Sequence, residues 1–423
     1  MQLIKTNKPN LKALLTTATC ALLGGTAQAA SEETWEFDTA IMQYAEVDRV
    51  MATEAIIAGK KTFSNDDVLS LKLTLDALTG ASPNGATAQP TPQTFTRPSG
   101  NGQYTVEPFE TPLDDTFHDT RVQLTGQWTQ PLLKDYTVSV GGNFSKEYDY
   151  MSASLNGNVA KDFNNKNTTL SAGMAYAYDV ITPEGGIPNP FSAMVINGSD
   201  DEFDQTRIGS DETKSTMDLL FGLTQVINRK MIVQFNYSYS TASGYLTDPF
   251  KVVSSVSTNG EAQEYLYEHR PDERTKHSFF AQTKYHFDSG ILDASYRYMT
   301  DDWKINSHTF DFRYLIPFSN GHFIEPHFRA YTQGAAEFYE PFIEQDKTLP
   351  SFVSADYRIG ELDTYTVGLK YGLPMGDGND LSFRLEYYHQ TPKSNGTEAI
   401  GVLKGVELYE PVDAIIAQVT YSF

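Results

Sequence analysis

The chain has 423 residues and a formal net charge of -22, and it is 40% hydrophobic and 13% aromatic. The excess of acid excludes nucleic acid and makes acidic surfaces poor partners, because charges of one sign repel each other. Many aromatic residues in an otherwise polar chain are typical of a membrane β-barrel, in which only the lipid-facing half of each strand must be apolar.

The first 29 residues predict a secretory signal peptide. A basic stretch with Lys5, Lys8 and Lys12 precedes an apolar run over residues 13–23 and a small-x-small cleavage motif at 27–29. We therefore divide the chain into a signal peptide, residues 1–29, and an outer-membrane barrel domain, residues 30–423. The single cysteine, Cys20, lies in the signal peptide, so the exported domain is expected to have no disulfide and no thiol chemistry.

The rest of the chain is a series of alternating segments. No later stretch reaches the roughly 18 consecutive apolar residues that a membrane helix needs. In residues 69–75, 122–128, 231–239 and 310–318, apolar side chains instead occupy most of every second position. A period of two places these side chains on one face of a strand. About sixteen such segments predict an all-β fold, a transmembrane antiparallel up-and-down β-barrel in the bacterial outer membrane.

The connections between the predicted strands fall into two classes. Short ones, several rich in Asn, Gly and Asp, lie near residues 61–66, 131–134, 162–166, 226–230, 287–290, 318–321 and 374–380. Longer ones lie near residues 77–118, 181–213, 242–273, 334–360 and 392–411, and three further outer connections, near 46–49, 147–150 and 300–303, must be short. This alternation matches short periplasmic turns and long extracellular loops.

Acidic residues are concentrated in the predicted outer loops. The densest group is Asp200, Asp201, Glu202, Asp204, Asp211 and Glu212. Clustered carboxylates suit a divalent cation that bridges them to each other or to lipopolysaccharide. The spacing matches no defined calcium loop, and a solvated acidic loop is the favoured interpretation. The metal therefore stays unknown, and no cofactor is expected.

The inward positions of the later strands carry the clearest functional signal. From residue 274 onward they are rich in Arg and Lys, whereas earlier strands place mostly Ser, Thr, Asn and Gln inward. The candidate lumen and selectivity residues are Arg297, Asp311, Arg313, Glu325, His327, Arg329, Lys370, Arg384 and Glu386. Because buried charge without water or partners is very costly, this basic arc must line water or be paired with acids.

Two interpretations of the basic arc stay open. In the first, Arg and Glu pair across strands and stiffen or plug the lumen. In the second, a long outer loop folds inward and sets its acids opposite the arc, which forms a charged constriction of the kind that sets selectivity in porins. Two loop segments, residues 76–100 and 244–253, combine turn residues with Pro and aromatics. They are candidates for an ordered lid or binding surface at the barrel mouth, and the alternative is that they only brace the strands.

An enzymatic function is not expected. A lipid-facing hydrolytic dyad needs a His and a Ser on the same outward face near the outer rim. His277, His308 and His389 lie on or near outward positions, but Ser278, Ser307 and Ser382 do not share that parity. The histidines are better explained as part of an aromatic girdle.

The last segment of the chain resembles the closing strand of outer-membrane barrels. Ile415, Ala417, Val419, Tyr421 and Phe423 share one face, and the chain ends on the aromatic residue. The barrel assembly machinery reads such a terminal aromatic signature, so Tyr421 and Phe423 are the expected assembly signal and this machinery is an expected partner.

Several multi-residue runs along the chain are distinctive: LTGASPNG at residues 78–85, GYLTDPF at 244–250, YRYMTDDW at 296–303, EPHFR at 325–329, YTQ at 331–333 and FY at 338–339. They resemble those of a bacterial family that is known only as a domain of unknown function and is predicted to form an outer-membrane barrel. The resemblance covers nearly the whole mature chain. It implies the barrel architecture and implies nothing about a substrate.

These observations favour a porin-like channel or binding protein for small polar solutes, embedded in outer-membrane lipid and lipopolysaccharide. The alternative is a non-conducting structural or surface-interaction barrel that partners an exported or periplasmic system. No feature of the sequence reports the oligomeric state.

Overall fold

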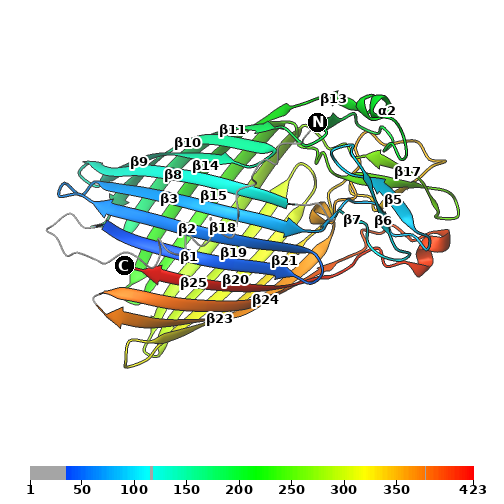
Figure 1. Cartoon of the computed structure of the whole chain (residues 1–423). Helices are drawn as coiled ribbons and strands as arrows, with labels where there is room; N and C mark the ends of the chain where they lie inside the picture. Colours follow the sequence, from blue (N-terminus) through cyan, green and yellow to red (C-terminus); the bar gives the residue numbers. More distant parts are fainter. Residues whose placement is uncertain (1–34, 115–117, 377) are drawn as a thin grey trace, which may run out of the picture.

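The computed structural model describes residues 35–114, 118–376 and 378–423. Within these residues, sixteen antiparallel strands close into a barrel in which each strand pairs with its neighbours in chain order (Figure 1). The strands are β1 (Trp35–Glu46), β2 (Val50–Thr62), β3 (Val68–Gly80), β8 (His118–Leu133), β9 (Tyr136–Lys146), β10 (Tyr150–Phe163), β11 (Thr168–Ile181), β14 (Glu212–Asn228), β15 (Met231–Gly244), β18 (Glu273–Phe287), β19 (Gly290–Asp301), β20 (Asn306–Pro317), β21 (Phe323–Gln333), β23 (Leu362–Gly376), β24 (Asn379–Pro392) and β25 (Val412–Ser422). The predicted fold class and strand number are confirmed. The predicted signal peptide, residues 1–29, lies outside the described residues.

The barrel is apolar outside and polar inside. On β9, the outward side chain of Val140 is 55% exposed, whereas the inward Ser139 is 7% exposed. Outward residues of other strands, such as Leu155, Phe235 and Leu385, are likewise exposed. A soluble sandwich would bury this apolar face, so the face must contact lipid. The protein is therefore an outer-membrane β-barrel. Within the described part of the chain, no helix has the length and apolar character needed to cross a membrane.

Short connections lie at the barrel end that carries the C-terminus (Figure 1). Asp135, between β8 and β9, has a φ of 67°, and Asn164 and Asn165, between β10 and β11, have φ values of 52° and 56°. Asn and Asp tolerate this left-handed conformation better than other side chains, because they form local hydrogen bonds. The predicted short connections all lie at this end, and the predicted long ones at the opposite end, so the alternation read from the sequence is confirmed.

The first and last strands complete the barrel. The backbone N–H of Phe37 donates to the carbonyl of Phe423 at 2.7 Å, and the N–H of Phe423 donates back to Phe37 at 2.9 Å. The ring of Phe423 stacks on Phe37 at 5.5 Å and on Tyr421 at 5.2 Å. These contacts join β1 to β25, so the barrel has no exposed edge strand that could pair with another chain. Phe423 contributes directly to this closure through its backbone and its ring.

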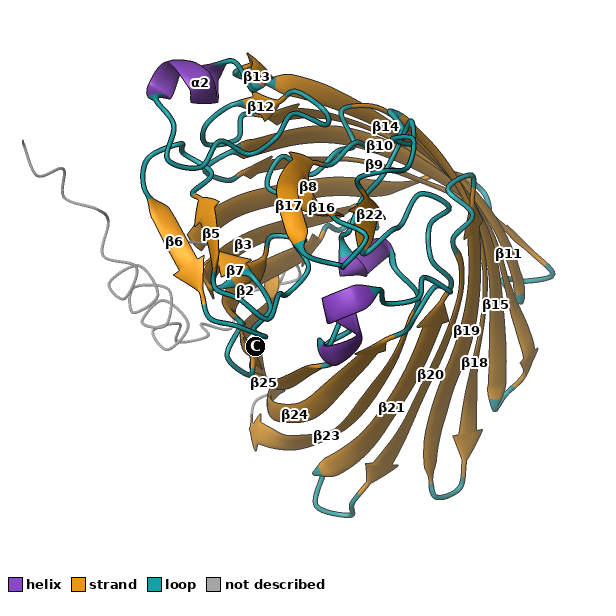
Figure 2. Cartoon of the chain, turned by 90° about the vertical axis from the view of Figure 1, so that its right-hand side faces the viewer, coloured by secondary structure: helices purple, strands orange, loops and turns teal. Residues whose placement is uncertain are grey.

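The long connections fold over the other end of the barrel as an outer cap, defined here as residues 81–114, 182–211, 245–272, 334–361 and 393–411 (Figure 2). The cap contains β4 (Ser82–Pro83), β5 (Gln93–Thr96), β6 (Gln103–Val106), β7 (Leu113–Asp114), β12 (Ile187–Pro188), α2 (Asp200–Asp204), β13 (Arg207–Gly209), β16 (Val252–Val256), β17 (Ala262–Tyr267), β22 (Phe342–Glu344) and the short 3-10 helices η1 (Tyr357–Ile359) and η2 (Gly401–Gly405). The pairs β4–β7, β5–β6 and β12–β13 and the three-stranded order β17–β16–β22 connect these segments.

The two loop segments predicted to form a lid pack against each other in this cap. Phe95 and Val252 are fully buried in one cluster with Tyr267. Gly85 has a φ of +94°, and a Cβ atom there would lie 2.5 Å from the carbonyl oxygen of Val252. Only glycine permits this close backbone approach. The two segments are therefore ordered and packed together in the cap.

Three residues of the predicted acidic group, Asp200, Asp201 and Glu202, form the first turn of α2. Ser199 and Glu202 make a capping box, in which each side chain bonds the other's backbone N–H. Acids in the first turn interact favourably with the positive end of a helix, while Phe203 is buried beneath. This geometry explains the acidic run as local helix stabilisation at the outer surface.

Candidate functional site in the barrel lumen

The nine charged residues selected from the sequence lie on five consecutive barrel strands, β19, β20, β21, β23 and β24, and all point into the lumen. Cross-strand register places them in rows. Arg313 pairs with His327, Asp311 with Arg329, and Glu325 with Lys370, which in turn pairs with Arg384. Rows that are two residues apart along a strand are separated by about 7 Å. The predicted basic arc is therefore a charged wall that runs along the barrel.

Part of this wall is a closed ionic network centred on His327. Its Nε2 atom is 3.0 Å from Oδ2 of Asp311, and its Nδ1 atom is 2.9 Å from Oε1 of Glu386. Arg313 lies 3.4 Å from Asp311 at one end, and Arg384 lies 3.7 Å from Glu386 at the other. Ionised carboxylates only accept hydrogen bonds, so an imidazolium, with two N–H donors, satisfies both contacts.

For Arg313 and Arg384, these contacts support the interpretation in which basic and acidic residues of the barrel strands pair with each other. Both are paired with acids from barrel strands. Within the residues that the structure describes, no acid of the outer cap makes an ion pair with any of the nine candidates. The predicted inward-folding loop therefore does not supply the counter-charges seen here.

A lumen cavity of about 490 Å³ lies beside this network and beneath the cap. Lys276 of β18, Arg297 of β19 and Arg329 of β21 line it, together with Asp218 of β14. Arg297 lies over the ring of Phe280 at 5.6 Å. Met299, also in the lining, packs against a buried cluster in which Trp303 joins cap residues such as Tyr339 and Ile359. Six hydroxyl side chains complete much of the lining: Ser238, Ser240, Ser278, Ser307, Thr309 and Tyr331.

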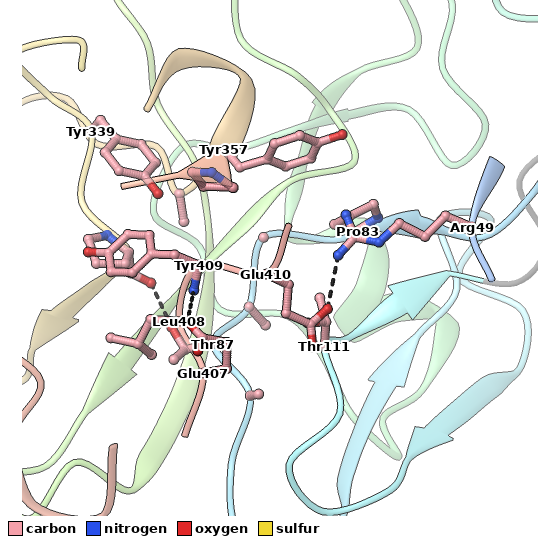
Figure 3. Close-up of a pocket in the computed structure, with 16 residues that line it drawn as sticks. Arg49, Pro83, Thr87, Thr111, Tyr339, Tyr357, Glu407, Leu408, Tyr409 and Glu410 are labelled. Atoms are coloured by element: carbon pink, nitrogen blue, oxygen red, sulfur yellow. Dashed lines mark hydrogen bonds and ion pairs between the residues drawn. The ribbon is translucent and has the colours of Figure 1, made fainter. Parts of the chain in front are cut away.

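A smaller hollow of about 80 Å³ lies in the cap itself, between the cap loops and the outer end of β1 and β2 (Figure 3). Arg49 and Glu410 form an ion pair of 2.9 Å on one side, and Tyr339 and Tyr357 lie on the other. Burial raises the pKa of both tyrosine hydroxyls, which keeps them uncharged. This hollow is too small for more than a few water molecules.

A buried ion cluster joins two cap loops. Arg270 lies 2.6 Å from Glu268 and 2.8 Å from Asp356, whose carboxylates are fully buried. Arg358 bonds the same Asp356 and also Asp248. Burial raises the pKa of Glu268, whereas Arg358, Lys251 and Arg270 outweigh burial and hold the pKa of Asp356 far below its ordinary range. The cluster fixes residues 245–272 against residues 334–361.

Three acids lie together at the outer rim. Asp119, Glu147 and Asp149 each place one carboxylate oxygen within 4.8 Å of the others. Burial, followed by repulsion from Asp119, raises the pKa of Glu147 to about 7, and the same two causes raise the pKa of Asp149. These acids are distinct from the sequence-predicted acidic group, which lies on and after α2.

The outward histidines are hydrogen-bonded in the membrane-facing girdle. His277 and His308 contact the hydroxyls of Tyr237 and Tyr296. His389 bonds Asp413 through Nδ1 at 2.7 Å and the hydroxyl of Thr391 through Nε2 at 3.0 Å. Reasoning from sequence considered serine alone and missed this threonine, although Thr391 shares the outward parity of His389.

The Asp413–His389–Thr391 group has the order of a hydrolytic triad, but it lies outside both lumen and cap cavities. Thr391 is exposed, and Asp413 also accepts a hydrogen bond from Tyr387. The contacts therefore fit an interfacial hydrogen-bond network, as the sequence indicated.

Of the cavity cations, Arg297 and Arg329 were selected from the sequence. Lys276 was not among the selected residues. Inward Ser and Thr were expected on the earlier strands, but their grouping with Tyr331 in one cavity was not. The alternation along each strand shows that these hydroxyl residues face the lumen. It does not show which lumen-facing residues of different strands line the same cavity.

Comparison with known proteins identifies a family of unknown function. A family model described as "Protein of unknown function (DUF3570)" matches residues 12–423. No protein with a curated functional description matches the chain.

Similar solved structures are outer-membrane proteins. A bacterial polysaccharide outer membrane secretin is 8% identical, with 93% of this chain and 100% of that chain covered and a TM-score of 0.44. OccK2 (OpdF) of Pseudomonas aeruginosa in complex with glucuronate is 9% identical, with 93% and 98% covered and a TM-score of 0.41. The monoaromatic hydrocarbon channel TodX is 11% identical, with 95% and 93% covered and a TM-score of 0.40. At such low identity these structures say nothing about the solute of this chain.

Proposed function

The chain belongs to the DUF3570 protein family, and we propose that it is a porin-like protein through whose lumen small polar solutes pass or in which they bind. The observation that carries this proposal is the cavity of about 490 Å³ lined by charged and hydroxyl side chains. Charges in a low-dielectric environment are very costly unless water, a counter-ion or a polar solute contacts them. A lumen built only to brace the strands would have no need of such a lining.

The ordered cap favours a second candidate function. Its buried ion cluster and the packing of Phe95 against Val252 hold the loops over the barrel mouth. A barrel closed in this way would act as a non-conducting structural or surface-interaction protein that partners an exported or periplasmic system.

Planar-bilayer recording of the purified protein tests both functions. The channel predicts steady single-channel steps from the wild-type protein. A matched variant with residues 86–111 replaced by a short Gly-Ser linker should conduct more, because part of the cap is removed. A silent wild-type protein and a conducting variant would instead establish the closed barrel, and silence of both would contradict the channel.

A further inference from the structure

Lys276 lies opposite an acidic residue whose carboxylate already bonds other groups. Asp301 lies opposite Lys276 in the β18–β19 pair. Its Oδ2 atom accepts from Nε of Arg274 at 2.9 Å, and its Oδ1 atom accepts from the backbone N–H of Ile305 at 2.8 Å. The carboxylate is fully buried by these contacts. Both oxygens of Asp301 are therefore occupied, and Lys276 makes no ion pair within the described residues.

The same pattern holds for the two arginines. Asp311 lies opposite Arg329, but its oxygens face His327 at 3.0 Å and Arg313 at 3.4 Å. The register neighbours of Arg297 are Phe280 and Thr309, which carry no charge. Within the part of the chain that the structure describes, neither arginine has a carboxylate within ion-pair distance.

Three cations therefore share one cavity with a single acid, Asp218. The lining carries two formal positive charges in excess. The guanidinium of Arg297 also lies over the ring of Phe280, with its carbon atom 5.6 Å from the ring centroid. This cation–π contact uses the face of the ring and occupies none of the guanidinium N–H donors, so they stay available to a carboxylate.

Resting on the proposed function, we propose that this lumen cavity is a binding site for a small polyhydroxylated carboxylate. The carboxylate is bound by Arg297 and Arg329, with Lys276 adding positive charge. The hydroxyls of the solute contact the Ser, Thr and Tyr hydroxyls, each of which both donates and accepts hydrogen bonds. A volume of about 490 Å³ accommodates a six-carbon solute with water around it.

Calorimetric titration of the detergent-purified protein with gluconate tests this proposal, with sorbitol and hexanoate as matched six-carbon probes. Sorbitol has the hydroxyls without the charge, and hexanoate has the charge without the hydroxyls. Gluconate is expected to bind at least about tenfold more tightly than either, because both sets of contacts are needed. R297Q and R329Q should each weaken gluconate binding by about tenfold.

The matched control variant is Lys284→Gln. Lys284 is a lumen cation on β18 outside the cavity lining, and it is already paired with Asp293 at 3.2 Å. Its replacement should leave gluconate affinity unchanged. Retention of heat-modifiable gel mobility in each variant verifies that the barrel is folded.

Three outcomes overturn the site: no gluconate binding, equal binding of all three probes, or equal losses in K284Q and R329Q. Preferential binding of inorganic phosphate, with gluconate silent, would overturn the carboxylate assignment. The channel is tested separately, because conductance with no gluconate binding rejects this site alone, whereas gluconate binding without conductance rejects passage through the lumen alone.

Discussion

His327 and Glu386 lie on β21 and β24, which are separated by β23, yet Nδ1 of His327 is only 2.9 Å from Oε1 of Glu386. The residue between them in register is Gly368, which has no side chain to separate them. A Cβ atom at Gly368 would lie 2.5 Å from Cγ of Glu386. The glycine therefore allows an ionic contact that spans three strands.

Gly368→Ala should break this contact, because Glu386 must move away from the new methyl group. We expect a loss of about 1–3 kcal/mol of stability, the range for a buried charged hydrogen bond whose partners are left unsatisfied. The measurement is the urea midpoint of folding into lipid vesicles. Gly334→Ala is the control, since a Cβ there meets no atom within 4 Å, and an equal loss in both variants would contradict the argument.

Arg329→Gln should lower the anion-to-cation permeability ratio more than Arg313→Gln does. Arg329 lines the lumen cavity, whereas Arg313 lies outside that lining and is engaged with Asp311. The reversal potential in a KCl gradient across a planar bilayer reports the ratio. An unchanged ratio in the Arg329 variant would count against a role of the arc in selectivity.

Arg270→Met should loosen the outer cap while the barrel stays intact. The change leaves the fully buried Glu268 without its cation and removes one of the two arginines that contact Asp356. Breaking one side of a buried ion pair typically costs about 3–5 kcal/mol. Faster protease cleavage within residues 245–272 would show the loosening, with heat-modifiable mobility unchanged.

The control for this change is Lys347→Ala, which removes an exposed ion pair with Glu344. Such pairs contribute about 0–1 kcal/mol, so cleavage should match wild type. Wild-type cleavage rates in the Arg270 variant would show that the cluster does not hold the cap.

Glu147 should make the outer rim less stable as the pH rises. Its folded pKa of about 7 lies above the ordinary value of 4.5, so the folded protein binds this proton more tightly than the unfolded chain does. The stabilising contribution is fully present below pH 4.5 and is lost as the pH rises through 7. Thermal midpoints of wild type and Glu147→Gln should coincide at pH 5 and differ at pH 8, with wild type lower. A constant difference across this range would refute the assignment.

Phe423→Ala should reduce assembly into the outer membrane. The ring stacks on Phe37 and Tyr421 at the seam between β1 and β25, and the terminal aromatic is the predicted assembly signal. Quantification of folded protein in the outer-membrane fraction measures the effect. Phe163 is another outward aromatic residue at the same barrel end, and Phe163→Ala should have a smaller effect. Equal losses of folded protein in both variants would contradict a special role of the terminal aromatic residue in assembly.

The amino-acid sequence alone predicts the barrel, the side of the wall on which each residue lies, and the ends at which short and long connections fall. These features follow from a period of two along each strand and from turn residues, both of which act over a few neighbouring positions. Inward parity was therefore enough to place Arg297, Arg329 and His327 in the lumen.

The pairing of these charges, in contrast, is visible only in the folded barrel. Asp311 pairs with His327 although Arg329 is its register neighbour, and Asp301 pairs with Arg274 although Lys276 lies opposite. The contact across Gly368 and the packing of Phe95 on Val252 join segments that are far apart in the chain. Such choices depend on side-chain reach and on strand register around the whole barrel, and no local pattern contains that information.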